Sequence, residues 1–418
     1  MIIHLNRSRS KRSFICLILF IIILLILNGR PKFIFQSHFH IPWLTDVQLV
    51  QSLKCTSHDW PDVLQSNNDD YAKQDSRLTI VIVTAQPEFK RLPLTLAALA
   101  CHLDSHRIFE VIFLTPLKDV HILEPFLSDR QTNHWPWPLS IIPDDHLLKH
   151  INTDSYRLQM IFKLVVSQII KTEYYMLLDS DCVAIWPIHV EQLLWQSNVN
   201  KSLPLYKALY QIEDRSDRIK WWLESEQLLK IKPNTCVSND PLSPTIGVTP
   251  IILSRTIALR TLCRLQILYG HRRFLNKLAN WALWRVIFDR MWTEYTLYYL
   301  TAQCTKTFDT YHFHRSSNLN FYGLSVWWRT DWTSFTRYQL IDLINIGLER
   351  RKKEINITNN LLMNTHSLFT VLQGRQYINP NLYHQLFYPL FIKYLQQQHN
   401  TLGLVKILNK MCEQLITK

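Results

Sequence analysis

Asp179 and Asp181 stand two residues apart, directly after the apolar run Tyr174–Leu178. In an extended chain the side chains of residues i and i+2 point the same way, so both carboxylates can face one cation. Burying two carboxylates is unfavourable unless a positive group pairs with them. Carboxylate oxygens are the ligands that Mg²⁺ and Mn²⁺ prefer. The spacing therefore predicts a site for Mn²⁺ or Mg²⁺ with Asp179 and Asp181 as its ligands.

The same motif has two other interpretations. Asp179-Ser-Asp181-Cys-Val183 also matches the motif of haloacid-dehalogenase-type phosphatases, in which the first Asp is a nucleophile. That superfamily usually carries the motif on its first strand and needs a downstream Lys and an acidic pair. Here three predicted strands precede the motif, and no clear Gly-Asp pair follows it. A capped turn with two solvated aspartates is the structural alternative, and the apolar strand before Asp179 favours the cation site over both.

The elements around this motif alternate between strands and helices. Apolar, β-branched runs predict strands, and longer amphipathic segments predict helices. Such alternation is typical of a doubly wound α/β domain with a mainly parallel sheet and helices on both faces. Ligands bind at the carboxyl ends of the strands in these sheets, and Asp179 stands at such an end. The predicted strands are 78–84, 109–115, 139–142 and 174–178, and the predicted helices are 94–102 and 156–171.

Composition excludes several other classes of protein. The chain has 418 residues, of which 47% are hydrophobic and 12% aromatic, so it is not disordered. Its net charge is +13, and six basic residues precede the first acidic residue, Asp46, which leaves +7 for the rest. Beyond the short run Arg350–Lys353 no basic patch stands out. We therefore expect no nucleic-acid partner.

The N-terminal region predicts a membrane anchor. Phe14–Leu27 is an unbroken apolar run with basic residues on both sides. Extended to residues 13–29, it predicts a single span with the basic N-terminal tail in the cytosol. A cleaved signal peptide is the alternative, although small residues at a cleavage site are scarce. The expected localisation is the Golgi or endoplasmic reticulum membrane, as a single-pass type II protein with a lumenal domain.

The rest of the chain predicts a stem, an α/β domain and a helical extension. Seven of the eight Cys lie beyond the anchor, and this odd number leaves at least one either unpaired or in an intermolecular bond, which would allow a homodimer. Asn200 and Asn356 open glycosylation sequons that a lumenal domain could use. The predicted organisation is a cytosolic tail at 1–12, an anchor at 13–29, a stem at 30–76, the α/β domain at 77–330 and a mostly helical extension packed on it at 331–418.

Several motifs together resemble a little-characterised family of nucleotide-sugar glycosyltransferases with the GT-A fold. The similarity covers roughly residues 77–315. The resemblance implies transfer of a sugar from a nucleotide diphosphate, with a metal bound at the Asp-x-Asp motif. One departure is that the first strand ends in Thr84-Ala-Gln-Pro87, without an acidic residue. The motifs are Tyr156-Arg-Leu-Gln159 with Lys163-Leu164, Tyr174–Asp181, Gly247-Val-Thr-Pro250 and Trp292-Thr-Glu-Tyr295.

The resemblance also implies roles for individual residues. Asp181 would bind the metal directly, and Asp179 would bind the ribose or reach the metal through water. A late histidine, His312 or His314, would complete the metal site. The ion would neutralise the diphosphate leaving group as a Lewis acid. The remaining nucleotide-sugar-binding candidates are Thr84, Arg157, Gln159 and Lys163.

Gln159 and Lys163 are spaced i, i+4, so they share one face of the predicted helix. Lys163 could reach a phosphate from there, and a solvated helix face is the alternative. Glu294 stands among large aromatic residues, whose desolvation would raise its pKa and suit it as a general base on an acceptor hydroxyl. Alternatively, Glu294 binds donor sugar hydroxyls or is a buried structural residue. Asp289 is the second candidate for the catalytic base.

The predicted function is metal-dependent transfer of a sugar from a UDP- or GDP-linked donor to a glycan, protein or lipid acceptor in the secretory pathway. A non-catalytic glycan-binding protein with the same fold is the alternative from another class. That protein would tolerate loss of Asp181, and the enzyme would not.

Overall fold

The computed structural model describes sixteen stretches of the chain. The chain divides into two compact units, residues 1–47 and 48–418, and all described residues belong to the second. The described residues are 55, 76–128, 133–148, 151, 153–196, 206–214, 219–232, 235–237, 244–271, 273–280, 292–314, 319–322, 331–354, 366–372, 379–398 and 400–416.

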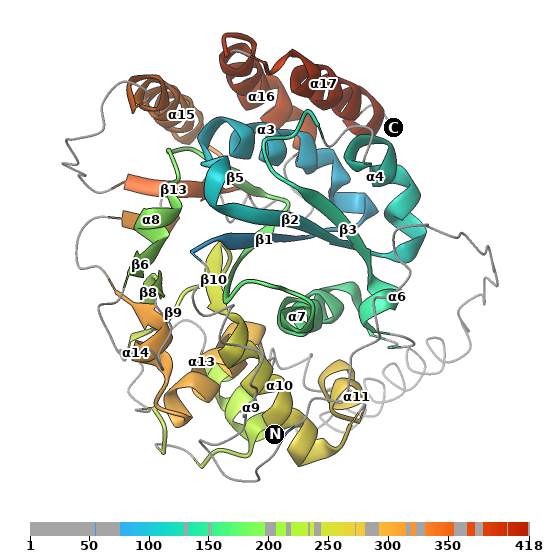
Figure 1. Cartoon of the computed structure of the whole chain (residues 1–418), viewed down its shortest axis with the longest axis vertical. Coiled ribbons are helices and arrows are strands. Elements are labelled where there is room, and N and C mark those ends of the chain that lie inside the picture. Colours follow the sequence, from blue (N-terminus) through green and yellow to red (C-terminus); the bar gives the residue numbers. More distant parts are fainter. Residues whose placement is uncertain are drawn as a thin grey trace, which may run out of the picture. The chain divides into compact units, whose positions relative to one another are not determined.

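A five-stranded sheet forms the centre of this unit, with strand order β10-β4-β1-β2-β3 (Figure 1). The strands β4, β1, β2 and β3 pair in parallel, whereas β10 runs antiparallel to β4. The predicted mixed α/β architecture with a mainly parallel sheet is therefore confirmed. The strands are β1 (Leu78–Val83), β2 (Ile108–Thr115), β3 (Leu139–Pro143), β4 (Tyr174–Asp179) and β10 (Ile251–Ser254).

The strands at the centre of the sheet are apolar along nearly their whole length. Every residue of β1 is buried, and so are all residues of β4 except Asp179. A strand that is buried on both faces reads as a continuous apolar run, which explains why these segments were recognisable in the sequence. The register places Asp179 beside Val83 of β1, at the carboxyl edge of the sheet.

Helices pack around this sheet. Helix α7 (Ser155–Val165) contacts β1, α10 (Arg255–Tyr269) and α13 (Glu294–Cys304), whereas α3 (Leu92–His102) contacts α15 (Ser334–Glu354), α16 (Pro380–Gln396) and α17 (Leu402–Ile416) (Figure 1). The predicted helix 156–171 is shorter in the structure: α7 ends at Val165 and a 3-10 turn, Val166–Gln168, follows. The β-branched run after Leu164 disfavours continuation of the helix.

Three smaller sheets lie beside the central one. In the first, β13 (His366–Val371) pairs with both β12 (Leu319–Tyr322) and β5 (Cys182–Ala184). The amide of Leu372 donates to the carbonyl oxygen of Asp181 at 2.9 Å, so the segment after β13 holds the turn that carries Asp181. The other small sheets have the orders β11-β7-β6 and β8-β9.

The remaining described elements are short strands and helices. These are β6 (Leu194–Gln196), β7 (Tyr206–Leu209), β8 (Ile212–Asp214), β9 (Pro244–Ile246), β11 (His312–Phe313), α4 (Val120–Leu127), α6 (Asp144–Leu147), α8 (Val190–Leu193), α9 (Ile219–Leu229), α11 (Arg273–Ala279), α14 (Phe308–Tyr311), and the 3-10 helices Gln86–Arg91, Ser105–Arg107 and Leu117–Asp119.

Two disulfides cross-link the described residues. Cys55 bonds to Cys263 and Cys236 bonds to Cys304. Cys101 and Cys182 are free and buried, and Cys412 is free and half-buried. A disulfide restricts the unfolded chain and stabilises the fold by about 2–4 kcal/mol in typical cases. Both cross-links involve helices that cover the sheet, since Cys263 lies in α10 and Cys304 ends α13.

The membrane localisation predicted from the sequence is corrected by the structure. Among the described residues, no helix has both the length and the apolar character needed to cross a membrane. The predicted anchor, residues 13–29, lies outside the described residues, so the single-pass type II topology in the Golgi or endoplasmic reticulum membrane is not upheld. The tail, most of the stem, both sequon residues Asn200 and Asn356, and Asp289 also lie outside the described residues.

Helix α15 packs against the backbone of the segment that follows β5. A Cβ atom placed on Gly347 would lie 2.0 Å from the carbonyl oxygen of Ile185, which is far inside van der Waals contact. Only a residue without a side chain allows this approach. Gly347 thus lets α15 lie close to the strand that continues from the Asp181 turn.

We expect Gly347→Ala to lower the free energy of unfolding by about 1–3 kcal/mol, because the added methyl group overpacks this contact. Alanine is otherwise the better helix former by about 1 kcal/mol, so a loss of stability would have to come from the contact. Urea denaturation measures the effect. Asn345→Ala, at an exposed position of α15, is the control and should not destabilise the protein. A Gly347→Ala protein as stable as the wild type would contradict the packing.

Candidate functional site

The candidate site lies where β4 ends. Asp179 is the last residue of this strand, and the turn Ser180-Asp181 leads into β5. Lys163 reaches the same point from α7, and Glu294 reaches it as the first residue of α13. Residues from three segments distant in the sequence therefore meet at the carboxyl edge of the sheet, where doubly wound folds bind their ligands.

The Lys163 ammonium is the centre of this arrangement. Its Nζ lies 2.9 Å from Asp179 Oδ1 and 3.3 Å from Glu294 Oε1. It also donates to Thr249 Oγ1 at 3.2 Å and to the Tyr295 hydroxyl at 3.1 Å. The hydroxyls of Thr249 and Tyr295 are hydrogen-bonded to each other. Four oxygens thus surround one buried ammonium group.

The carboxylates keep Lys163 charged although it is buried. Its side chain is only 7% exposed, and burial by itself would lower the pKa of the ammonium. The negative charges of Asp179 and Glu294 outweigh burial and hold the pKa of Lys163 well above its ordinary value. A buried charge requires such partners to be stable. Lys163 is therefore a permanent cation of the site.

Glu294 is held at the N-terminus of α13. Thr293 is the N-cap of this helix and forms a capping box with Thr296. The Glu294 side chain is 2% exposed, and burial raises its pKa, while the neighbouring Lys163 charge acts in the opposite direction. A carboxyl group with a raised pKa, fixed by a cation, can exchange a proton with a bound hydroxyl.

The side chain of Asp181 differs from that of Asp179 in having no direct partner among the described residues. Within the described residues no hydrogen bond or ion pair reaches its carboxylate, whereas Asp179 is paired with Lys163. Burial raises the pKa of Asp181 to about 7, and the negative charge of Asp179 adds to this effect. The positive charge of Arg91 opposes it. The Asp181 carboxylate therefore has positive neighbours, Arg91 and Lys163, but no direct ion-pair partner among the described residues.

The Asp181 carboxylate, which has no direct ion-pair partner in the part of the chain that the structure describes, is suited to bind a divalent cation. Carboxylate oxygens suit Mn²⁺ and Mg²⁺, and a cation beside Asp181 would favour its charged form. Asp179 lies close enough for its charge to act on Asp181, and its side chain is 38% exposed. Asp181 would hold the ion directly, and Asp179 would add its charge from the position fixed by Lys163.

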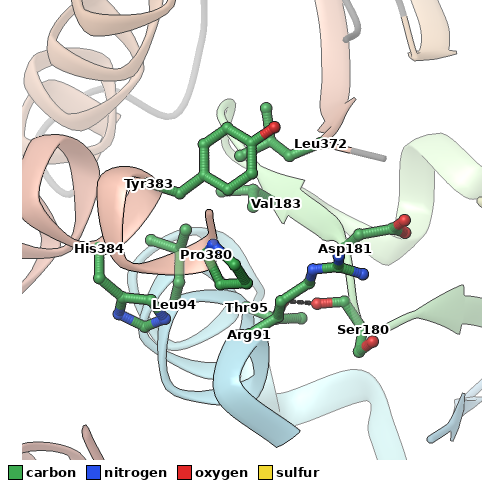
Figure 2. Close-up of a pocket in the computed structure, with 10 residues that line it drawn as sticks. All are labelled: Arg91, Leu94, Thr95, Ser180, Asp181, Val183, Leu372, Pro380, Tyr383 and His384. Atoms are coloured by element: carbon green, nitrogen blue, oxygen red, sulfur yellow. Dashed lines mark hydrogen bonds between the residues drawn. The ribbon is translucent and has the colours of Figure 1, made fainter. Parts of the chain in front are cut away.

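A small cavity lies on the other side of Asp181, with a volume of about 10 Å³, which is room for about one water molecule. Figure 2 shows Arg91 and Asp181 on one side of this cavity and Tyr383 and His384 of α16 on the other. Thr95 Oγ1 donates to the carbonyl oxygen of Ser180 at 2.7 Å and fixes the turn. The C-terminal helix α16 thus lies beside the turn that carries Asp181.

Thr84 lies at the end of β1, as expected for a nucleotide contact. Its Oγ1 is buried and has no hydrogen-bond partner among the described residues, and the same is true of Thr115 Oγ1. Because Val83 pairs with Leu114 in a parallel register, Thr84 and Thr115 are neighbours on adjacent strands. Buried hydroxyls normally have a partner, so these two are suited to a polar ligand. Sequence reasoning missed Thr115, although it ends the second predicted strand.

The other two candidates on α7 do not join this network directly. Arg157 is buried, donates to the carbonyl oxygen of Ala279 at 3.1 Å and lies 3.3 Å from Asp154. It ties α7 to α11. Gln159 is half-buried, one turn before Lys163 on the same helix. Thr249 and Tyr295, by contrast, contact Lys163. Neither is predicted as a site residue from the sequence, although they lie in the motifs Gly247–Pro250 and Trp292–Tyr295.

One of the two candidate histidines, His312, lies away from the acidic pair. The Tyr298 hydroxyl is hydrogen-bonded to His312 Nε2 at 2.6 Å and accepts from the Ser254 amide at 2.8 Å. Ser254 pairs with Tyr174, the first residue of β4, whereas Asp179 is the last. Five residues of strand span about 16 Å. His314 is exposed near Tyr210, with its ring centroid 5.6 Å from the tyrosine ring. The structure thus does not bring His312 to Asp181, and His314 stays a prediction.

Another cluster with metal-ligand types lies outside the site. Asp104, His189 and Glu191 hold their ligand atoms within 4.8 Å of one another. Each carboxylate already has a cationic partner, since Arg351 lies 2.6 Å from Asp104 and Arg107 lies 2.7 Å from Glu191. An added cation would gain little from carboxylates that are already neutralised. This cluster is better described as an ion-pair network that fastens α15.

The fold and the site define a class of protein: an α/β domain with an acidic pair at the carboxyl edge of a mainly parallel sheet. The chain belongs to the family of unknown function DUF6492, whose model matches residues 75–381. No curated protein matches the sequence. The family match covers the sheet, the acidic pair, Lys163 and Glu294.

The chain is also similar, at low identity, to several solved structures. The WbbM bifunctional glycosyltransferase has 13% identity and a TM-score of 0.38, and it covers 80% of this chain. This chain spans about half of it (52%). Mouse xyloside xylosyltransferase 1 has 10% identity and a TM-score of 0.36, covering 72% of this chain and 98% of its own. The galactosyltransferase LgtC has 12% identity and a TM-score of 0.33, and the match covers 74% of this chain and 95% of LgtC. Similarities at this level carry no argument about activity, which is therefore drawn from the site.

The burial of His312 predicts a pH dependence of stability. Burial lowers the pKa of His312 from 6.5 to about 3. Between these values the unfolded chain binds a proton that the folded chain does not, so stability falls as the pH falls below about 6.5. We expect His312→Asn to reduce the slope of unfolding free energy against pH between 6.5 and 4.5, by up to about 1.4 kcal/mol per pH unit. Urea denaturation at several pH values measures it.

His314→Asn is the control for this series, because His314 is exposed and only two residues away. It should leave the slope unchanged. An unchanged slope in His312→Asn would show that His312 does not lie in the buried position described.

Proposed function

We propose that this protein is a metal-dependent glycosyltransferase that uses a nucleotide-diphosphate sugar as donor. The observation that carries the proposal is the unpartnered carboxylate of Asp181 beside Asp179, at the sheet edge that also holds Lys163 and Glu294. A divalent cation at Asp181 would bind a diphosphate and neutralise its charge as the sugar is transferred. The motif resemblance in the sequence supports the same chemistry.

The hydroxyls of Thr84 and Thr115 would bind polar atoms of the nucleotide. Both lie at the carboxyl edge of the sheet, as does Asp179, and both lack a partner among the described residues. A nucleotide placed there would lie with its diphosphate toward Asp181. This placement supports a UDP- or GDP-linked donor without distinguishing between them.

Glu294 would act as the base that takes the proton from the acceptor hydroxyl. Lys163 fixes one of its oxygens at 3.3 Å, and burial raises its pKa toward neutrality, where a base is most effective. The alternative role, binding of the donor sugar hydroxyls, uses the same position. The acceptor is proposed to be a glycan, protein or lipid that offers such a hydroxyl.

The phosphatase alternative is less compatible with this geometry. A dehalogenase-type enzyme needs a lysine downstream of the motif, whereas the lysine that contacts Asp179 is Lys163, upstream of it. The motif also ends β4, which follows three other strands of the domain in the sequence. These two features favour the transferase.

Calorimetric titration of UDP and of GDP into the full-length protein tests the proposed function. We expect one nucleotide to bind in the presence of Mn²⁺ and to lose at least about tenfold in affinity when EDTA is added, because the ion links the diphosphate to Asp181. Asp181→Asn should cause the same loss. Asp342→Asn, an exposed residue on α15, is the matched control and should bind like the wild type. Failure of both nucleotides to bind the folded wild type would contradict the proposal.

Replacing Glu294 separates catalysis from binding. We expect Glu294→Gln to lower the rate of sugar transfer, measured as the nucleoside diphosphate formed from the donor, by about 100-fold or more. This is the usual contribution of a general base. Affinity for the nucleotide with Mn²⁺ should stay within about threefold of the wild type, because Asp181 is unchanged. Glu349→Gln, exposed on α15, provides the control. A Glu294→Gln protein with the full rate would remove Glu294 from the reaction.

A further inference from the structure

Lys163 is saturated by contacts within the protein. An ammonium group has three hydrogens to donate, and four oxygens already lie within 3.3 Å of Nζ: those of Asp179, Glu294, Thr249 and Tyr295. No hydrogen remains for a phosphate oxygen unless one of these contacts breaks. The predicted role of Lys163 as a phosphate contact is thus hard to reconcile with its surroundings.

Lys163 is held at its backbone as well as at its ammonium group. The Tyr175 hydroxyl donates to the carbonyl oxygen of Lys163 at 3.0 Å, and Tyr175 is a buried residue of β4. Helix α7 packs on β1, α10, α11 and α13. The ammonium therefore cannot move far from the end of β4, and it joins three segments there: β4, α13 and the loop that contains Thr249.

This geometry divides the acidic pair. Asp179 Oδ1 lies 2.9 Å from Lys163 Nζ, whereas the carboxylate of Asp181 has no direct partner among the described residues. We propose that Lys163 is a positioning residue that holds Asp179 and Glu294 in place and, by its fixed positive charge, limits the affinity of the acidic pair for a divalent cation, so that Asp181 alone binds the ion directly. The inference rests on the proposed function and adds a role for Lys163 that is distinct from nucleotide binding.

The physical reason is the balance of charge. A cation that approaches Asp181 is attracted by both carboxylates and repelled by the ammonium group. The repulsion is largest where the surroundings exclude water, as they do around Lys163. The ion would then bind tightly enough to hold a diphosphate and weakly enough to leave with the product. Removing the ammonium should strengthen ion binding while it releases Glu294 from its position.

The test measures Mn²⁺ binding to the full-length protein by calorimetry, without nucleotide, for Lys163→Met and Lys163→Arg. We expect Lys163→Met to bind Mn²⁺ at least about tenfold more tightly than the wild type, since a unit charge close to the ion has been removed. Nucleotide release from the donor sugar should fall at least about tenfold in the same variant. Lys163→Arg keeps the charge and should keep the wild-type Mn²⁺ affinity. Lys277→Met, exposed on α11, is the matched control and should change neither quantity.

In Lys163→Met the Mn²⁺ affinity should rise while the rate of sugar transfer falls. A misfolded site would instead lose both Mn²⁺ affinity and rate, so the two measurements separate the positioning role from a merely structural one. Mn²⁺ affinity that is unchanged or weaker in folded Lys163→Met would overturn the inference. If Lys163→Met does not fold, the pair Asp179→Asn and Asp181→Asn decides instead. Asp181→Asn should lose about 100-fold or more in Mn²⁺ affinity and Asp179→Asn less than about tenfold. Equal losses would overturn the inference. Absence of Mn²⁺ binding by the wild type would contradict the proposed function itself.

Discussion

Three carboxylates converge where β4 ends, and the rest of the site depends on the single ammonium that lies among them. Lys163 forms ion pairs with Asp179 and Glu294, whereas the Asp181 carboxylate has no direct ion-pair partner among the described residues. Placing several acidic groups in a partly buried site is unfavourable, so the site needs the permanent cation Lys163, and the proposed function adds a second, exchangeable cation. The sheet, α7 and α13 are arranged so that these groups meet.

Much of this arrangement could be predicted from the sequence because it depends on local patterns. The strands of a buried parallel sheet are continuous apolar runs, so β1 and β4 were recognisable, and Asp179 follows as the residue that ends β4. The i, i+4 spacing put Lys163 on a defined helix face. The spacing does not say where that face points. In the structure it points toward Asp179 and Glu294, and Tyr295 and Thr249 also contact the Lys163 ammonium.

Other features depend on packing between distant segments and left no local signal. His312 looked like a metal ligand by residue type, but the pairing of Ser254 with Tyr174 puts it at the opposite end of β4. The approach of α16 to the Asp181 turn and the contact of Gly347 with Ile185 also join segments far apart in the sequence. The predicted membrane anchor was a composition argument, and the described helices do not support the localisation drawn from it.

The most direct test of the account is the position of the ion. A crystal of the full-length protein grown with Mn²⁺ and the nucleotide that binds would be measured at the manganese absorption edge. We expect an anomalous peak within about 2.2 Å of an Asp181 carboxylate oxygen, with Lys163 still bound to Asp179. A peak at the Asp104, His189 and Glu191 cluster, with none at Asp181, would contradict it.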